Sequence, residues 1–416
     1  MRFSARRLGG ALLTALMLFT AACGIDIAAQ DAPEWSAGWS AAAQRPSIGF
    51  GPNWSEAGFS DETLRQVVRV SNGGDRIRIR LSNRFGAAPL RITGATVAAA
   101  ADGAALRPET LRQLTFDGAA TVEIAAGGEI SSDAASLPVD PMDSVTVTLY
   151  LRETTGPATF HSQAWTDSYR AAGDHRSDID GAAFTERTSS WYYLVDVEVA
   201  GAAGRRDTVV AFGDSITDGF GSTPGANHRW PDALADRLAA TGRQRAVLNL
   251  GIGGNLVAND TAWYGDRATT RFRRDVLDKP GVRTVVLLQG VNDIGFSESD
   301  QPTYEPNPDV PVEQIIAGYR TLIGLAHEHG IRMIGATLLP FGGSTHDSAR
   351  SEAKRRALNA WIRTSGEFDA IVDFERALAD PANPAVLLAA YDSGDHLHPN
   401  DAGYRRMAEA LDPTLL

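Results

Sequence analysis

The chain has 416 residues, of which 43% are hydrophobic and 22% are charged, so it is long and apolar enough for two ordinary domains. Its formal net charge is −12. An excess of acidic side chains repels phosphate backbones. The composition therefore argues against general disorder and against nucleic acid as a partner.

The first 22 residues are predicted to be a signal peptide. A basic segment, residues 1–7, precedes the apolar run Leu8–Phe19, and small residues follow. The run is too short to span a bilayer comfortably. A buried N-terminal helix is the alternative, but it does not account for the order of basic flank, apolar run and small residues. We therefore expect export, and loss of residues 1–22 would take the net charge to −15.

The only cysteine, Cys23, follows the small residues Thr20, Ala21 and Ala22 directly. This order resembles a bacterial lipobox, in which the cysteine is lipidated and becomes the mature N-terminus, although Thr20 stands where lipoproteins usually have leucine. Lipidation would tether the protein to a membrane without a spanning helix. Two localisations stay open, a cell-envelope lipoprotein (periplasmic or surface) and a secreted protein. The body after Cys23 has no cysteine for a disulfide or a thiolate metal site.

After a linker at residues 23–34, residues 35–204 are predicted to form a β-sandwich accessory domain, jelly-roll-like in type. Short strands separated by glycine-rich turns are typical of such folds. The alanine-rich stretch at 98–105 is predicted to be a loop. Three segments alternate polar and apolar side chains, as strands with one face in water do, namely Arg76–Leu81, Ser144–Leu149 and Tyr193–Val199.

Residues 205–416 are predicted to form an α/β domain. Short apolar runs, which suit buried parallel strands, alternate here with amphipathic segments that suit helices. The runs are Thr208–Phe212, Ala246–Leu250, Thr284–Leu288 and Ile331–Leu338, and the helical segments are Trp230–Ala240, Arg267–Leu277 and Val312–His329. The pattern predicts a parallel sheet covered on both faces. In such sheets ligands bind beyond the carboxyl ends of the strands.

Polar residues gather after these runs and near the C-terminus. A serine on a tight strand-to-helix turn exposes its hydroxyl and its own backbone N–H. A histidine can take the serine proton and return it to the leaving group, and a carboxylate three residues earlier can orient the ring. We therefore expect Ser215 as nucleophile, His398 as base and Asp395 as its orienter. Gly254 would offer a backbone N–H, and Asn292 a side-chain amide.

Each of these residues also has a structural interpretation. Ser215 alone would serve equally well as a helix N-cap, and Asn292 as a cap of its strand end. Asp395, His396 and His398 alone would suggest a metal site, although the other histidines and acids show no complementary ligand spacing.

Taken together, four segments resemble the motif blocks of SGNH hydrolases, also called GDSL esterases and lipases. They occur in the family order over roughly residues 207–416. Ile216 stands where the name GDSL has leucine. The matching segments are Gly213-Asp214-Ser215, Gly254, Gly290-Val291-Asn292-Asp293 and Asp395-His396-Leu397-His398.

The resemblance implies a flavodoxin-like three-layer fold that needs neither a metal nor a cofactor. It also implies an oxyanion hole made by the N–H groups of Ser215 and Gly254 and the side chain of Asn292. The Gly-x-Ser-x-Gly elbow of α/β-hydrolases is absent around Ser215, which disfavours that larger fold.

The function implied is that of an exported serine esterase acting through an acyl-serine intermediate. The first domain is similar to sandwiches attached to some SGNH carbohydrate esterases, which favours short acyl groups, such as acetyl, on glycans. Two alternatives stay open. One is a lipase or lysophospholipase at the envelope, and the other is a non-catalytic glycan-binding protein. The expected partners are an ester substrate, such as an acylated glycan, and a membrane if Cys23 is lipidated.

Overall fold

The computed structural model describes residues 35–201, 207–299, 301–305 and 307–416. The predicted signal peptide, Cys23 and the predicted boundary at 204/205 lie outside the described residues. We call residues 35–201 the β-sandwich region and residues 207–416 the α/β region.

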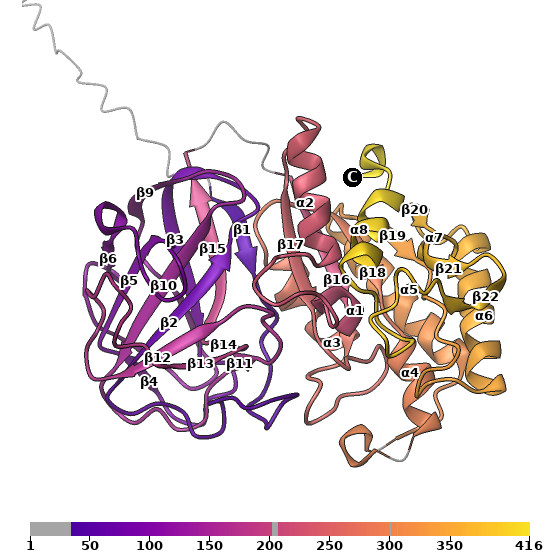
Figure 1. Ribbon diagram of the computed structural model, residues 1–416, viewed down its shortest axis with the longest axis horizontal. Coiled ribbons are helices and arrows are strands. Elements are labelled where there is room, and N and C mark those ends of the chain that lie inside the picture. Colours follow the sequence, from indigo (N-terminus) through magenta and orange to yellow (C-terminus); the bar gives the residue numbers. More distant parts are fainter. Residues whose placement is uncertain (1–34, 202–206, 300, 306) are drawn as a thin grey trace, which may run out of the picture. The chain divides into compact units, whose positions relative to one another are not determined.

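Two antiparallel sheets build the β-sandwich region, as expected (Figure 1). One sheet has the order β1-β15-β3-β8, with β9 also pairing with β3, and the other has the order β13-β12-β2-β10-β5-β6. The first contains β1 (Ser36–Ser40), β3 (Gly74–Ser82), β8 (Glu129–Ser131), β9 (Ala135–Val139) and β15 (Leu194–Ala200). The second contains β2 (Glu62–Arg69), β5 (Gly94–Ala99), β6 (Arg112–Leu114), β10 (Ser144–Leu151), β12 (Ser168–Ala172) and β13 (Glu186–Thr188). Two short pairs complete the region: β4 (Leu90–Ile92) with β7 (Val122–Ile124), and β11 (Phe160–His161) with β14 (Trp191–Tyr192).

The predicted alternation of wet and dry faces is only partly correct. In β3 the side chains of Ile77, Ile79 and Leu81 are fully buried and the residues between them are partly exposed, as predicted. In β10 and β15 the prediction of a wet face is wrong, because both faces of these strands are covered. Polar side chains on a buried face need partners, since an unpaired buried charge is costly.

The acids of β15 find such partners. Asp196 accepts hydrogen bonds from Ser40 Oγ and from Lys279 Nζ, each at 2.5 Å. Glu198 pairs with Arg78 at 2.5 Å. Because Lys279 belongs to the α/β region, one buried charge of the sandwich is neutralised from outside it.

The prediction of a loop at 98–105 is wrong for its first two residues. Ala98 and Ala99 complete β5, and Ala98 is fully buried. Both faces of this strand are covered: Val97 lies in the sandwich core, and Thr96 Oγ1 donates to the carbonyl oxygen of Arg176 at 3.2 Å. Small side chains at this strand therefore reflect close packing rather than a loop.

Five parallel strands form the central sheet of the α/β region, in the order β17-β16-β18-β19-β20. The first strand in the chain lies second in the sheet, which is the doubly wound, flavodoxin-like order. The strands are β16 (Thr208–Gly213), β17 (Ala246–Gly251), β18 (Val282–Leu288), β19 (Arg332–Ala336) and β20 (Ala370–Val372). A small hairpin, β21 (Ala379–Asp380) with β22 (Asn383–Leu387), lies apart from it. The predicted three-layer fold is confirmed.

Two groups of helices cover this sheet (Figure 1). Helix α8 contacts α2 and α7, while α5 contacts α3 and α6, and α6 also contacts α4. Helix α5 shows why these segments fold as predicted, since its buried residues recur every three or four positions from Ile315 to Ala326. The helices are α1 (Ser215–Asp218), α2 (Trp230–Ala240), α3 (Ala268–Phe272), α4 (Val291–Gly295), α5 (Val312–Glu328), α6 (Ala349–Thr364), α7 (Phe374–Leu378) and α8 (Asp401–Ala410). A π-helical turn, Arg273–Leu277, continues α3.

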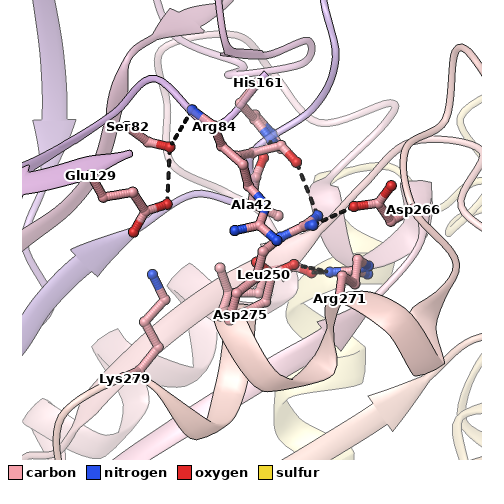
Figure 2. Close-up of polar contacts among 12 residues, drawn as sticks. Ala42, Ser82, Arg84, Glu129, His161, Leu250, Asp266, Arg271, Asp275 and Lys279 are labelled. Carbon is pink, nitrogen blue, oxygen red and sulfur yellow. Dashed lines mark hydrogen bonds and ion pairs between the residues drawn. The ribbon is translucent and has the colours of Figure 1, made fainter. Parts of the chain in front are cut away.

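The two regions share a packed junction, and residues 34–416 form one compact unit. Strand β1 pairs with β15 and also contacts β17, and its Ala37 belongs to the hydrophobic core of the α/β region. Figure 2 shows polar contacts near this junction. There the buried Arg271 donates to the carbonyl oxygen of Leu250 at 2.8 Å and also to Asp275. None of the described helices is long and apolar enough to cross a membrane.

Candidate active site

Ser215 opens helix α1 directly after strand β16, on the turn that the sequence predicts. Asp214 caps the helix, because its Oδ1 accepts the N–H of Ile216 at 3.1 Å. A Cβ on Gly213 would overlap the side chain of Thr217 and the carbonyl oxygen of Leu288, so the tight turn requires glycine. The first N–H groups of a helix have no intrahelical acceptor. The turn therefore presents both the hydroxyl and the N–H of Ser215.

His398 and Asp395 meet this serine from the C-terminal loop. Ser215 Oγ lies 2.8 Å from His398 Nε2, although 183 residues separate the two in the chain. Asp395 Oδ2 lies 2.6 Å from His398 Nδ1, while its Oδ1 accepts the N–H groups of Leu397 and His398. Burial opposes ionisation of Asp395, but its hydrogen bonds and the charge of His398 outweigh burial and hold its pKa well below the usual range. The serine, imidazole and carboxylate thus form one continuous hydrogen-bonded chain.

The neighbouring His396 does not join this chain. Its Nδ1 lies 2.6 Å from Asp392 Oδ2, and its side chain is mostly exposed. In the part of the chain that the structure describes, no group of three or more His, Cys, Asp or Glu side chains is placed to hold a metal ion.

Gly254 lies in the loop after β17 and Asn292 in the first turn of helix α4, after β18, at the same edge of the sheet. Gly213 pairs in register with Gly251, and so the loop that carries Gly254 lies beside the serine turn. Gly254 has a left-handed φ of +73°, and a Cβ there would overlap the ring of Tyr264, so only glycine fits. Asn292 Nδ2 donates one hydrogen bond, at 3.0 Å, to the carbonyl oxygen of Asn255. This hydrogen bond ties Asn292 to the loop that carries Gly254.

The comparison with family models decides the identity of the α/β region. Residues 211–406 match the GDSL-like lipase/acylhydrolase family. These residues form a GDSL hydrolase domain. The protein is therefore a serine ester hydrolase, and the alternative of a binding protein that retains only the fold is not supported.

Solved structures similar to this GDSL hydrolase match about half of the chain. A protein from Desulfitobacterium hafniense DCB-2, described as lipolytic and of the G-D-S-L family, is 25% identical over 49% of this chain and 96% of its own, with a TM-score of 0.37. An acetylxylan esterase from Geobacillus stearothermophilus is 23% identical over 50% of this chain and 93% of its own, with a TM-score of 0.38. The comparison with curated proteins returned no relative.

His346 is a buried residue next to Asn292 that the sequence analysis missed. Its Nε2 lies 3.4 Å from Asn292 Oδ1, among the rings of Phe296, Tyr304 and Phe341. Burial, with a smaller contribution from the charge of His398, lowers the pKa of His346 to about 4. The ring is neutral at pH 7 and can donate Nε2–H to the amide oxygen, which turns the amide nitrogen away from His346. The only indication of His346 in the sequence is that it follows the predicted strand Ile331–Leu338.

A second missed contact comes from the β-sandwich region. His161 Nε2 lies 3.0 Å from Asp218 Oδ1. Its Nδ1 lies 2.9 Å from the carbonyl oxygen of Ala42, and His161 and Ala42 are labelled in Figure 2. The other oxygen, Asp218 Oδ2, accepts the N–H of Gly253 at 2.9 Å. Burial opposes protonation of His161, but the charge and hydrogen bond of Asp218 outweigh it and raise the pKa. A histidine of the sandwich thus holds the loop next to Gly254.

Two buried carboxylates lie behind the GDSL hydrolase site. Asp293 accepts the N–H groups of Val257 and Ala258. Burial raises the pKa of Asp214 to about 7, with a smaller contribution from the charge of Asp293, and raises the pKa of Asp293 to about 6. A carboxyl group whose pKa is raised on folding stabilises the fold at low pH, and this contribution is lost as pH rises through the folded-state pKa.

We expect Asp214→Asn to change the pH dependence of stability. Asparagine keeps the oxygen that accepts the Ile216 N–H but cannot ionise. Between pH 4 and 8 the free energy of unfolding of the variant should therefore rise relative to wild type by about 1–4 kcal/mol, since one pKa unit corresponds to about 1.4 kcal/mol. Urea unfolding of both proteins at the two pH values measures this difference. An equal difference at both pH values would contradict a buried, titrating Asp214.

Proposed function

We propose that Ser215 is the nucleophile of this ester hydrolase, His398 its general base and Asp395 the group that orients His398. The observation that carries the proposal is the 2.8 Å contact between Ser215 Oγ and His398 Nε2, with Asp395 at 2.6 Å on the other ring nitrogen. This geometry leaves Nε2 as the acceptor for the serine proton while Nδ1–H is held by the carboxylate.

The reaction then runs in two halves. Ser215 Oγ attacks the ester carbonyl carbon as its proton passes to His398 Nε2, and the C–O bond to the alcohol breaks as His398 returns that proton to the alcohol oxygen. Water next attacks the acyl-serine as its proton passes to His398, and the bond from the acyl carbon to Ser215 Oγ then breaks as His398 returns that proton to Oγ and the carboxylic acid leaves. Each half passes through a tetrahedral oxyanion, which needs hydrogen-bond donors.

The proposed donors are the N–H groups of Ser215 and Gly254 and the amide of Asn292. Support comes from the position of the Gly254 loop and of the start of helix α4 at the strand ends, and from the hydrogen bond that ties Asn292 to Asn255 beside Gly254. His346 would keep the amide in the donating orientation.

Replacement of Asn292 by alanine is expected to lower kcat by about 10²–10³-fold with little change in KM. The hydrogen bond from Asn292 strengthens most when the carbonyl oxygen acquires charge in the transition state. In other enzymes, removal of one such donor lowers kcat by about 10²–10³-fold. Asn292→Asp should be worse at neutral pH, because a carboxylate would face the oxyanion. If Asn292 only caps its strand, both variants would melt earlier but keep kcat in the folded fraction, so kcat and Tm are measured on the same preparations.

For the substrate we propose a short acyl ester, such as an acetyl ester, of a carbohydrate. A packed group of aromatic rings supports the short acyl group, since Tyr264 contacts Gly254 and also packs on Phe296, which stacks on Tyr304 at 3.8 Å. Because Tyr264 and Phe296 are buried beside Gly254, we expect room there for a short acyl group only. Hydrolysis of p-nitrophenyl esters from acetate to palmitate tests this. We expect a preference for the acetate ester. A preference for long acyl chains would favour the alternative of a lipase or lysophospholipase.

We also propose export, with Cys23 as the lipidated residue of a cell-envelope protein. The support is the sequence pattern of residues 1–23 alone. Fractionation of cells that express wild type and Cys23→Ser would test it, since only the wild type should stay with the membranes. Wild type found free of membranes would leave secretion as the remaining localisation.

A further inference from the structure

A cavity of about 170 Å³ lies in the β-sandwich region next to the proposed catalytic residues. Three segments of the sandwich line it, and Pro224 alone comes from the α/β region. It is smaller than the roughly 300–1,000 Å³ pockets that take drug-sized ligands. We call it the sandwich cavity. The lining residues are Phe50–Pro52, Ser162, Gln163, Trp165 and Ser189 with its neighbours Thr188 and Ser190.

Two contacts place the sandwich cavity beside the reacting groups. The ring of Trp165 packs edge-on against Phe220 at 5.5 Å, and Phe220 packs against the imidazole of His398 at 4.4 Å. On the other side, Gln163 Oε1 lies so close to Gly253 that a Cβ there would overlap it, and Gly254 follows directly. The cavity is therefore one side chain away from the proposed base.

Unpaired polar atoms in the lining indicate what the sandwich cavity takes. Ser162 and Gln163 are only 9% and 7% exposed. Within the described residues, Ser162 Oγ, Gln163 Oε1 and Trp165 Nε1 are buried without a hydrogen-bond partner. Buried polar groups are normally paired, and each unpaired one costs stability. An amide oxygen that accepts, an indole N–H that donates and a hydroxyl that can do both suit hydroxyl groups on a compact ring and do not suit an aliphatic chain. Trp165 is also held at a left-handed φ of +54°, a strained conformation that bulky residues rarely adopt.

Proximity to His398 identifies the part of the ester that occupies the cavity. His398 must return the proton to the alcohol oxygen, so the alcohol part leaves on the side of the imidazole. Resting on the function proposed above, we propose that the sandwich cavity is the subsite for the alcohol part of the ester and binds one sugar ring through Ser162, Gln163 and Trp165. The β-sandwich region is thus a part of the substrate site.

A larger groove continues from this subsite. It has a volume of about 760 Å³ and shares five lining residues with the sandwich cavity, namely Gly51, Pro52, Thr188, Ser189 and Pro224. Tyr169 and the ion pair of Arg187 with Asp167, at 3.0 Å, lie along it. An aromatic ring and charged hydrogen-bonding groups can hold further sugar rings, so the preferred alcohol should be an oligosaccharide.

Comparison of two acetate esters tests the subsite. Methyl 6-O-acetyl-glucopyranoside carries a sugar alcohol and p-nitrophenyl acetate does not. The ratio of kcat/KM for the sugar ester to that for p-nitrophenyl acetate should fall about 3- to 10-fold in Gln163→Ala and in Trp165→Phe, the range expected for loss of one neutral hydrogen bond. Trp165→Phe keeps an aromatic ring but removes the N–H donor. Gln113→Ala, at an exposed glutamine of β6 on the same region, is the matched control and should leave the ratio unchanged.

Three outcomes separate the possibilities. Equal losses on both esters would overturn the sugar subsite while leaving the catalytic proposal intact. A higher kcat/KM of Gln163→Leu on p-nitrophenyl octanoate would also overturn it, because the cavity would then take the acyl chain. Full activity of Ser215→Ala would instead overturn the proposed mechanism on which the subsite rests. Circular dichroism and Tm of each variant show whether it is folded.

Discussion

Replacement of Ser215 by alanine should lower kcat by about 10⁶-fold, the loss seen when a serine hydrolase loses its nucleophile. Without Oγ no acyl-enzyme can form, and only the oxyanion donors and substrate binding remain. The side chain is small and its residue is only 6% exposed, so alanine fits the same space. The measurement is p-nitrophenyl acetate hydrolysis together with Tm, which should stay close to that of wild type.

A double variant provides the control for this result. Ser215 and His398 share one hydrogen bond and would act as a unit. Ser215→Ala, His398→Ala and the double variant should therefore be about equally inactive. Losses that multiply in the double variant would show that the two residues act separately. A phosphonate reagent that modified a residue other than Ser215 would also contradict the assignment.

Asp395→Asn is expected to lower kcat by about 10⁴-fold. Asparagine keeps the Oδ1 that accepts the N–H groups of Leu397 and His398, so the loop should hold its shape. Its amide would place a donor where Asp395 Oδ2 now lies 2.6 Å from His398 Nδ1. The ring would then be driven towards the tautomer that carries its proton on Nε2, which cannot accept the proton of Ser215.

The same loop offers a matched control. His396 and Asp392 form a second pair at 2.6 Å, but His396 is mostly exposed and has no hydrogen bond to Ser215 among the described contacts. His396→Asn should keep most of the activity, since asparagine tolerates the left-handed φ of +64° at this position. A large loss in His396→Asn with a small one in Asp395→Asn would exchange the proposed roles of the two pairs.

The first four strands of the parallel sheet could be predicted from the sequence, whereas β20 and helices α6, α7 and α8 were not predicted. Strand β16 and helix α2 lie within one residue of the predicted segments, because apolar runs in a sheet buried on both faces are unambiguous. Ser215 and Asn292 closely follow two of those runs, so the order of strand ends brings them to one edge, whereas Asp395 and His398 come from the C-terminal loop. For the same reason the sequence indicates this part of the site well.

The fold class of the β-sandwich region was predicted correctly, but the exposure of its individual strands was not. Alternation in β15 suggested a wet face, yet Asp196 and Glu198 are buried by partners that lie far away in the chain, such as Lys279. His161 and His346 were missed for a related reason. Their roles depend on contacts with Asp218 and Asn292, and no local spacing reveals such contacts.

The place of strand β1 has a consequence for biosynthesis. Ser36–Ser40 leaves the ribosome long before its neighbours, since it pairs with β15 and its Ala37 is packed in a core completed by β17, Ala246–Gly251. Strand β1 therefore cannot complete its packing until the chain has been made as far as β17. Until then an apolar strand edge stays uncovered, which is the kind of surface that chaperones hold and that aggregates when they do not.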